Sequence, residues 1–193
     1  MSRWGTALER VAIVVVSFVI AIGAIVLLSG YFTARDQAGV TGVLSGPGLI
    51  FRDLGDRVLR PGERPPAYDS NPPTSGAHVP TAVRSDESVL DDGQILTALA
   101  SGDVILMYGG ATPPRGLAAL ARSAGGAFSP ALAQTGQAVI LARLPGINGI
   151  EALAWTRLLS ITGVVNLTER DETVLSQFID AWLGNGATGS RNN

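Results

Sequence analysis

The chain has 193 residues, of which 46% are hydrophobic and only 16% charged, and its formal net charge is -2. This charge gives no electrostatic reason to expect a nucleic-acid partner, and we predict none. All fourteen basic residues are arginine and cysteine is absent, which excludes lysine Schiff-base chemistry, disulfides, a thiol nucleophile and thiolate metal sites.

An uninterrupted apolar run near the N-terminus predicts a membrane anchor. Residues 11–32 carry no charged side chain, and about 20 apolar residues are enough to cross a bilayer core. Residues 1–10 contain Arg3 and Arg10 against Glu9, so the positive-inside rule places them in the cytoplasm. We expect a single-pass protein in the lipid bilayer of the cell membrane, with its C-terminal part extracytoplasmic. A cleaved leader is the alternative, although its apolar region is typically only about 7–15 residues long.

Residues 33–62 are predicted to form a stalk. Their first half is rich in Gly, Ser and Thr without a sustained period, which is typical of a flexible spacer. Residues 49–60 place apolar side chains near helical spacing among arginines, which predicts a short amphipathic helical turn that ends at Pro61-Gly62. Such a turn suits a membrane surface, and equally the following domain or a partner helix.

Residues 63–184 are predicted to form an extracytoplasmic α+β domain in the order strand, helix, strand, strand, helix. The apolar runs at residues 103–108 and 138–142 are typical of buried strands. A helical pattern lies between these runs, starts at Pro113 and ends at Gly125-Gly126. The connection through this helix predicts that the two strands are parallel.

The remaining elements follow in the C-terminal third. Residues 152–161 fit a helix or a strand, and we predict a strand that pairs back on residues 138–142, because the Pro-Gly-Ile-Asn-Gly connection suits a hairpin-like return. A last helix begins near Thr168, which can cap it, and its buried stripe is Val174, Leu175, Phe178, Ile179 and Trp182. Both helices are expected on one sheet face. Residues 185–193 are predicted to be a flexible tail.

The single histidine, His78, lies in a proline-rich segment that suits the presentation of one side chain. Proline fixes φ and pushes the preceding residue toward extended backbone, so the segment is stiff and non-helical. A triad of Ser75, His78 and Asp69 is not expected, because three neighbours in one loop rarely supply the required geometry and an oxyanion hole. We predict no catalytic residue and do not favour an enzyme. The residues selected as a ligand-binding or structural motif are Tyr68, Asn71, Pro72, Pro73, Ser75, Gly76 and His78.

Metal binding has little support in the residue types. A metal site normally recruits three or four ligands, and the chain offers His78 no second imidazole and no thiolate. Met107 is the candidate for a soft, copper-type site with His78, which leaves a copper-binding protein or metal-dependent enzyme as the alternative function. The acidic residues Asp86, Glu87, Asp91 and Asp92 lack the spacing of a calcium loop and indicate a solvated loop. We predict no cofactor.

Several strings together resemble a bacterial family of membrane-anchored extracytoplasmic domains of unknown function, over about residues 68–184. They are Tyr68-x-Ser-Asn-Pro-Pro-Thr-Ser-Gly-x-His78, the strand at residues 104–108, Ala152-Leu153-x-Ala-Trp155-x-Arg157-Leu158-Leu159 and Phe178-Ile179-Asp180-Ala181-Trp182. Family members carry a His-x-x-Glu-His-Gly string before that strand and often another His within it, and these histidines with the motif His look like a metal site. The corresponding positions here are Thr97, Ala100, Ser101, Gly102 and Met107. The resemblance therefore implies the fold and the location and argues against catalysis.

These observations favour a non-catalytic, extracytoplasmic binding or accessory module. We expect it to be a small subunit of a larger membrane complex, with other membrane protein subunits as partners. A monomeric domain that binds a small extracytoplasmic ligand is a further possibility, and a polar pocket beside Tyr68 and His78 would favour it.

Overall fold

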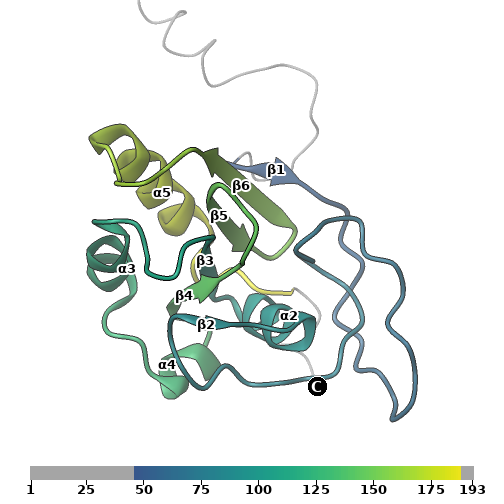
Figure 1. The fold of residues 1–193 in the computed structure, drawn as a ribbon. Coiled ribbons are helices and arrows are strands. Elements are labelled where there is room, and N and C mark those ends of the chain that lie inside the picture. The colour runs from purple at the N-terminus through teal and green to yellow at the C-terminus, as the bar shows by residue number, and fades with distance from the viewer. Residues whose placement is uncertain (1–45, 188–193) are drawn as a thin grey trace, which may run out of the picture. The chain divides into compact units, whose positions relative to one another are not determined.

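A mixed six-stranded sheet organises residues 46–187, the part of the chain that the computed structural model describes (Figure 1). The predicted anchor at residues 11–32 lies outside this part. Within the described residues, no helix has the length and apolar character needed to cross a membrane.

The strands follow the spatial order β1-β6-β5-β3-β4-β2. β4 is parallel to both β3 and β2, whereas the pairs β3 with β5, β5 with β6 and β6 with β1 are antiparallel. The strand bounds are β1 (Leu49–Ile50), β2 (Ser88–Val89), β3 (Val104–Tyr108), β4 (Val139–Arg143), β5 (Gly149–Ala154) and β6 (Arg157–Thr162). The helix bounds are α2 (Asp92–Ser101), α3 (Leu117–Gly125), α4 (Pro130–Gln134) and α5 (Glu169–Trp182).

The structure confirms the α+β class and the elements with the clearest patterns. β3 and β4 are buried, parallel strands joined through α3, as the apolar runs predicted. α5 begins after Thr168, which forms a capping box with Asp171, and it buries Leu175, Phe178, Ile179 and Trp182. These elements were predictable because their signals are local in the sequence.

The predicted single strand over residues 152–161 is wrong. The segment forms two antiparallel strands, β5 and β6, which turn at Trp155 and Thr156. Thr156 has a φ of 60°, although a tight turn of this kind normally uses Gly or Asn, so no turn signal marks this position in the sequence. β5 also pairs with β3 rather than with β4, which places β3 at the centre of the sheet.

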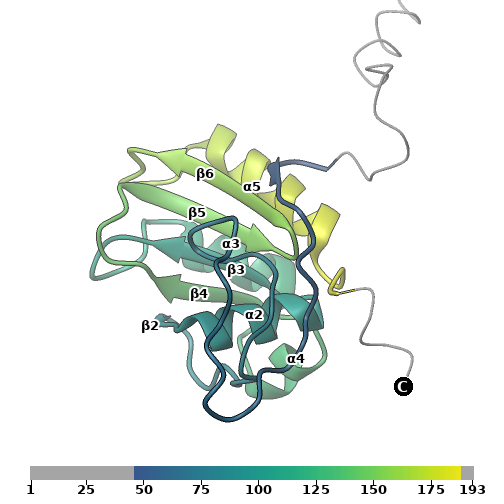
Figure 2. The ribbon, with the colours of Figure 1, turned by 90° about the vertical axis from the view of Figure 1, so that its right-hand side faces the viewer.

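Helices cover both faces of the sheet rather than one. α3 and α5 share a face, as predicted, and pack with Val104, Leu106 and Tyr108 of β3. The opposite face carries two helices that were not predicted, α2 and α4, which pack with the alternate residues Ile105 and Met107. Figures 1 and 2 show this division, with α5 and α2 on opposite sides of the strands.

The acidic residues interpreted as a solvated loop in part begin α2. Asp91 is the N-cap, and its side chain accepts a hydrogen bond from the amide of Gln94, whose own side chain accepts from the amide of Asp91. Asp92 lies in the first turn, where its charge complements the helix dipole. Asp91 and Asp92 are thus a helix start, whereas Asp86 lies before the helix and its Oδ1 accepts a hydrogen bond from the amide of Leu141 in β4 at 2.7 Å.

The N-terminal segment is extended, so the amphipathic helical turn predicted over residues 49–60 is wrong. Leu49 and Ile50 form β1 on the edge of β6, and Val58 forms an isolated bridge with His78. We call residues 51–60 the N-terminal arm. The regular spacing of its apolar residues was misleading because the arm finds its hydrogen-bond partners in other segments of the chain.

The C-terminal segment also differs from the prediction. Residues 185–187 are docked on the domain rather than flexible: the amide of Ala187 donates to the carbonyl of Ala100 at 3.0 Å, and Ala187 is buried. Residues 188–193 of the predicted tail lie outside the described part. The start of the described chain is also docked: Trp182 Nε1 donates to the carbonyl of Pro47 at 2.9 Å, so α5 holds this segment.

A hydrogen bond of the Asp103 side chain links the starts of the parallel strands β3 and β4, because Asp103 directly precedes β3 and Ala138 directly precedes β4. It is 1% exposed, and its Oδ1 accepts a hydrogen bond from the amide of Ala138 at 2.8 Å. Burial raises the pKa of this carboxyl to about 7, although the hydrogen bond from Ala138 opposes the shift.

The raised pKa predicts an inverse dependence of stability on pH. Between about pH 4 and pH 7 the folded chain keeps the proton of Asp103 and the unfolded chain loses it, so the free energy of unfolding should fall by up to about 4 kcal/mol as pH rises through this window. Asp103→Asn keeps the acceptor without the charge and should remove this component. Urea unfolding at pH 4.5 and pH 8 measures both proteins, and an equally steep decline in the variant would contradict the assignment.

Candidate functional site

The proline-rich motif is a buried loop held by the N-terminal arm. Residues 72–78 are buried although they form no helix or strand beyond a single bridge. The amide of Gly76 donates to the carbonyl of Gly55 at 2.8 Å, and the amide of His78 donates to the carbonyl of Arg57 at 3.0 Å. The carbonyl of His78 accepts from the amide of Leu59 at 2.9 Å. The arm thus provides the hydrogen bonds that a buried loop needs.

Ser75 fastens the arm with its side chain. Its Oγ donates to the carbonyl of Arg52 and accepts from the amide of Leu54, both at 3.0 Å, and the residue is fully buried. On the other side of the motif, the carbonyl of Thr74 accepts from the amide of Thr156 in the β5–β6 turn at 3.0 Å. Ser75 is therefore a structural residue and not a nucleophile.

The other predicted motif residues shape the loop. The Tyr68 hydroxyl donates to the carbonyl of Ala77 at 3.0 Å, and the ring packs on Gly76, where a Cβ would come within 2.8 Å of two ring carbons. Gly76 also has a φ of +135°, which other residues rarely adopt. The Asn71–Pro72 peptide bond is cis; Asn71 is exposed, whereas Pro72 and Pro73 are buried.

The imidazole of His78 has a defined orientation. It is 5% exposed, and its Nδ1 lies 2.9 Å from the carbonyl oxygen of Gly76. Since a carbonyl oxygen only accepts, Nδ1 carries the proton, and in the neutral ring Nε2 presents a lone pair. The loop therefore holds one nitrogen in place and leaves the other as an acceptor for a ligand.

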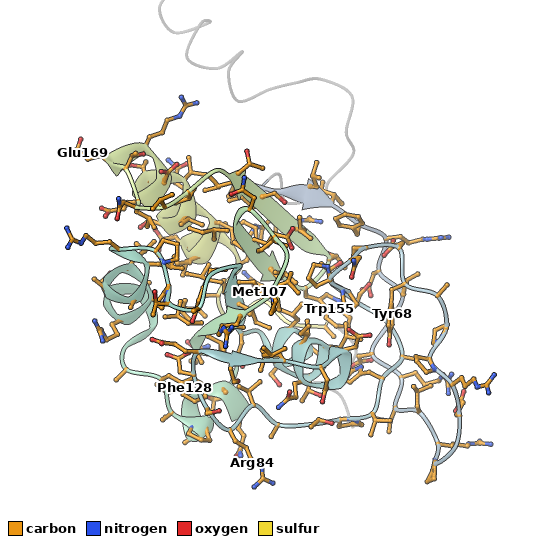
Figure 3. The ribbon with its side chains drawn as sticks, viewed as in Figure 1. Tyr68, Arg84, Met107, Phe128, Trp155 and Glu169 are labelled. Carbon is orange, nitrogen blue, oxygen red and sulfur yellow. The ribbon has the colours of Figure 1, made fainter. Side chains whose placement is uncertain are left out.

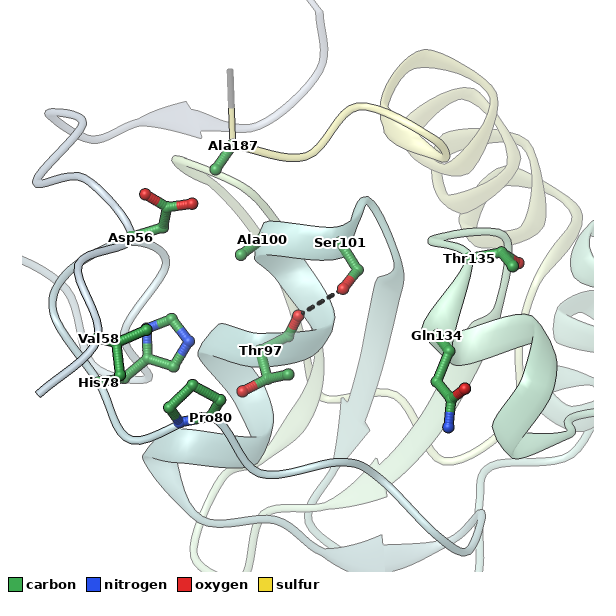
Figure 4. A pocket seen from close by; sticks show the side chains of 10 residues that line it. All are labelled: Asp56, Val58, His78, Pro80, Thr97, Ala100, Ser101, Gln134, Thr135 and Ala187. Atoms are coloured by element: carbon green, nitrogen blue, oxygen red, sulfur yellow. Dashed lines mark hydrogen bonds between the residues drawn. The ribbon is translucent and has the colours of Figure 1, made fainter. Parts of the chain in front are cut away.

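A pocket of about 390 Å³ lies against this imidazole. It forms where four parts of the chain meet: the arm, the motif, the C-terminal half of α2 and the end of α4, with the C-terminal segment at its rim (Figure 4). Its lining residues are Asp56, Val58, His78, Pro80, Thr97, Ala100, Ser101, Gln134, Thr135 and Ala187. We call this the His78 pocket.

The hydroxyls of the pocket are partly engaged by backbone. Thr97 Oγ1 donates to the carbonyl of Gly93 at 2.6 Å and accepts from the amide of Thr81 at 2.9 Å. Ser101 Oγ donates to the carbonyl of Thr97 at 3.0 Å. The Thr135 hydroxyl likewise donates to the carbonyl of Leu132 at 2.8 Å. His78 Nε2, the Asp56 carboxylate and the Gln134 side chain then remain as the polar groups that the described chain leaves for a ligand.

The structure brings His78 together with the positions that the resemblance had connected to it. Thr97, Ala100 and Ser101 occupy the α2 wall of the pocket, but they present hydroxyl and methyl groups. Among the described residues, no three His, Cys, Asp or Glu side chains are placed to hold one metal ion. The residues present therefore do not fit the transition-metal site that the resemblance implied for other members.

Met107 is not part of the pocket. It is buried in the core on β3 and lies in the interior of the domain, as Figure 3 shows. Asp69 and Ser75, the other two residues of the triad considered above, make structural hydrogen bonds instead. The Asp69 carboxylate accepts from the amide of Arg52 at 3.1 Å, and the Ser75 hydroxyl bonds the arm. Asp56 and Gln134 were missed, since nothing in the sequence near either residue indicates that it lines a pocket with His78.

Comparison with known proteins gives one family. The model of a family described as "Protein of unknown function (DUF3105)" matches residues 62–192. No curated protein and no solved structure matches the chain.

Removal of the Ser75 hydroxyl should loosen the arm. In Ser75→Ala, the Leu54 amide and the Arg52 carbonyl lose their partner, and we expect the free energy of unfolding to fall by about 1–3 kcal/mol. Hydrogen exchange at the Leu54 amide should become faster. Ser123→Ala is the matched control, because that exposed hydroxyl bonds only within α3, and it should change stability by less than about 0.5 kcal/mol. Equal effects of the two variants would contradict the fastening role.

Proposed function

The chain belongs to the family described as protein of unknown function (DUF3105). We propose that it is a non-catalytic binding module, anchored in the membrane with its domain extracytoplasmic. The observation that carries the binding function is the polar His78 pocket, because its histidine is oriented by the backbone and faces a volume of about 390 Å³. That volume suits a small ligand.

The polar groups of the pocket favour a ligand rich in hydrogen-bond donors. His78 Nε2 in the neutral ring and the Asp56 carboxylate both accept, and the Gln134 amide both donates and accepts. Hydroxyl and amine groups match this set, as in polyols, sugars and polar amines. A carboxylate or phosphate ligand is disfavoured, because it would face the carboxylate of Asp56.

Catalysis has no support in the same geometry. The hydroxyls of Thr97 and Ser101, which form part of the α2 wall, donate to backbone carbonyls, so neither is paired with a base. The copper-type alternative also loses support, since Met107 packs in the core instead of lining the pocket with His78.

The proposal of a membrane anchor is supported by the uncharged apolar run at residues 11–32 and by the arginines that precede it. Other membrane protein subunits as partners stay a prediction.

The absence of native cysteine makes a direct test of the orientation simple. In intact cells, a membrane-impermeant maleimide should label a full-length Arg64→Cys variant, because Arg64 is exposed on the domain. The control Ser2→Cys should be labelled only after lysis, since residue 2 is predicted to be cytoplasmic. Labelling of Ser2→Cys but not of Arg64→Cys in intact cells would reverse the proposed orientation.

Ligand binding should depend on His78. We expect polyols, monosaccharides or polar amines to raise the thermal midpoint of the full-length protein in detergent. His78→Phe keeps a ring in the motif but removes the acceptor, and it should weaken the binding of any such compound about tenfold or more. Val79→Ala is the control, because Val79 is exposed and does not line the pocket. Binding that is equal in both variants would place the ligand elsewhere.

A further inference from the structure

Two asparagines of the described chain are followed by glycine, and this pairing exposes a side-chain amide to chemical modification. The backbone nitrogen of the following residue can attack the side-chain carbonyl carbon of an asparagine. Glycine favours the attack, because it has no side chain to crowd it and adopts the widest range of backbone conformations. The two pairs are Asn148-Gly149 and Asn185-Gly186.

The other two asparagines of residues 46–187 lack such a neighbour. Asn71 precedes Pro72, whose backbone nitrogen carries no proton to lose. Asn166 precedes Leu167, whose side chain crowds the approach of the backbone nitrogen. The sequence therefore limits the reaction within this range to the two pairs, and the structure distinguishes between them.

Asn185 is held in place by hydrogen bonds and packing. Its Nδ2 donates to the carbonyl of Ala181 at 2.9 Å. The next residues are docked on the end of α2: the amide of Ala187 donates to the carbonyl of Ala100 at 3.0 Å, and a Cβ on Gly186 would come within 2.1 Å of that carbonyl oxygen. The side chain and the main chain must both leave these contacts before the nitrogen of Gly186 can reach the side chain of Asn185.

Asn148 has fewer restraints. It is exposed and directly precedes β5, at the open end of the β5–β6 hairpin. Its backbone carbonyl accepts from the amide of Gly163 at 3.0 Å, but its side-chain amide makes no hydrogen bond with any described residue. Gly149 is required by the fold, because its φ is +132° and a Cβ would come within 2.0 Å of the carbonyl oxygen of Ile161. The hairpin thus keeps a glycine beside an exposed, unrestrained asparagine.

We propose that Asn148 is a site of spontaneous deamidation and that the fold protects Asn185 from the same reaction. The backbone nitrogen of Gly149 loses its proton to solvent and forms a bond with Cγ of Asn148. The bond from Cγ to Nδ2 then breaks, and the nitrogen takes up protons from solvent and leaves as ammonia. Water opens the resulting cyclic imide at either of its carbonyls, which gives aspartate or isoaspartate. In the balance, water is consumed and ammonia is released, without oxidation or reduction.

The product changes the open end of the hairpin. Asn148, Glu151, Ser160 and Thr162 are among the residues that line a cavity of about 270 Å³, so the new carboxylate adds negative charge to a cavity that already includes Glu151. Isoaspartate also inserts a methylene group into the main chain beside the hydrogen bond to Gly163. Hydrogen exchange at the Gly163 amide should therefore be faster in the isoaspartate product.

This inference goes beyond the proposed function, because it assigns a modification site at a residue that does not line the His78 pocket. It requires no ligand, so its test is independent of ligand binding and of the location of the domain.

Peptide mapping after incubation tests the proposal. Full-length protein in detergent is kept at mildly alkaline pH and digested at intervals with trypsin. Because every basic residue is arginine, cleavage gives the peptides 144–157, 158–170 and 171–191, each with a single asparagine: Asn148, Asn166 and Asn185 respectively. Mass spectrometry should show loss of the Asn148 amide about tenfold or more faster than loss of the Asn185 amide. Asn166 should stay unmodified over the same period.

The same incubation in urea is the matched control. Unfolding removes the contacts that protect Asn185, so the two pairs should then react at rates within about threefold of each other. Asn148→Gln lengthens the side chain and should abolish the modification of peptide 144–157 in folded protein, while peptide 171–191 behaves as in the unmodified chain. Equal rates at Asn148 and Asn185 in the folded protein, or reaction of Asn148 in urea but not in the folded protein, would overturn the proposal.

Discussion

The backbone pairing between the N-terminal arm and the proline-rich motif is the contact on which the candidate site depends. A buried loop must find partners for every amide and carbonyl, and prolines remove amide donors from that requirement. Remaining backbone groups of the motif find hydrogen-bond partners in the arm. The backbone of Gly76 and His78 bonds the arm backbone, and Ser75 bonds it through its hydroxyl. Because these bonds fix the loop, the imidazole of His78 has one orientation relative to α2.

The second requirement is a helix for the loop to face. α2 packs through its apolar side on the sheet and turns Thr97 and Ser101, which are one turn apart, toward two pockets. Its end is held by Gly102, whose left-handed conformation is compatible with the bonds that its amide makes to Ala98 and Leu99. The amide of Ala187 then bonds Ala100, so the C-terminal segment completes the rim of the His78 pocket.

Two pockets lie along α2. The His78 pocket is the larger, whereas the smaller one is mostly apolar and includes the buried residue Asp103 in its lining. Thr97 and Ser101 line both pockets. Because these side chains carry hydroxyl groups and not imidazoles, the α2 wall of the His78 pocket offers hydrogen-bonding groups, and the described residues place no set of three metal-ligating side chains there.

The sequence by itself determined the α+β class, β3, β4, α3 and the capped start of α5, because each has a pattern or capping signal within a few residues. It also identified the motif around His78 and rejected a triad there. The membrane anchor remains a prediction from sequence. Only the tertiary structure decided that Thr156 divides residues 152–161 into two strands, that the arm is extended, and that Asp56, Gln134 and Asp103 line pockets beside α2. These features rest on contacts between segments far apart in the chain, such as Leu54 with Ser75 and Ala138 with Asp103, and local spacing carries no record of such partners.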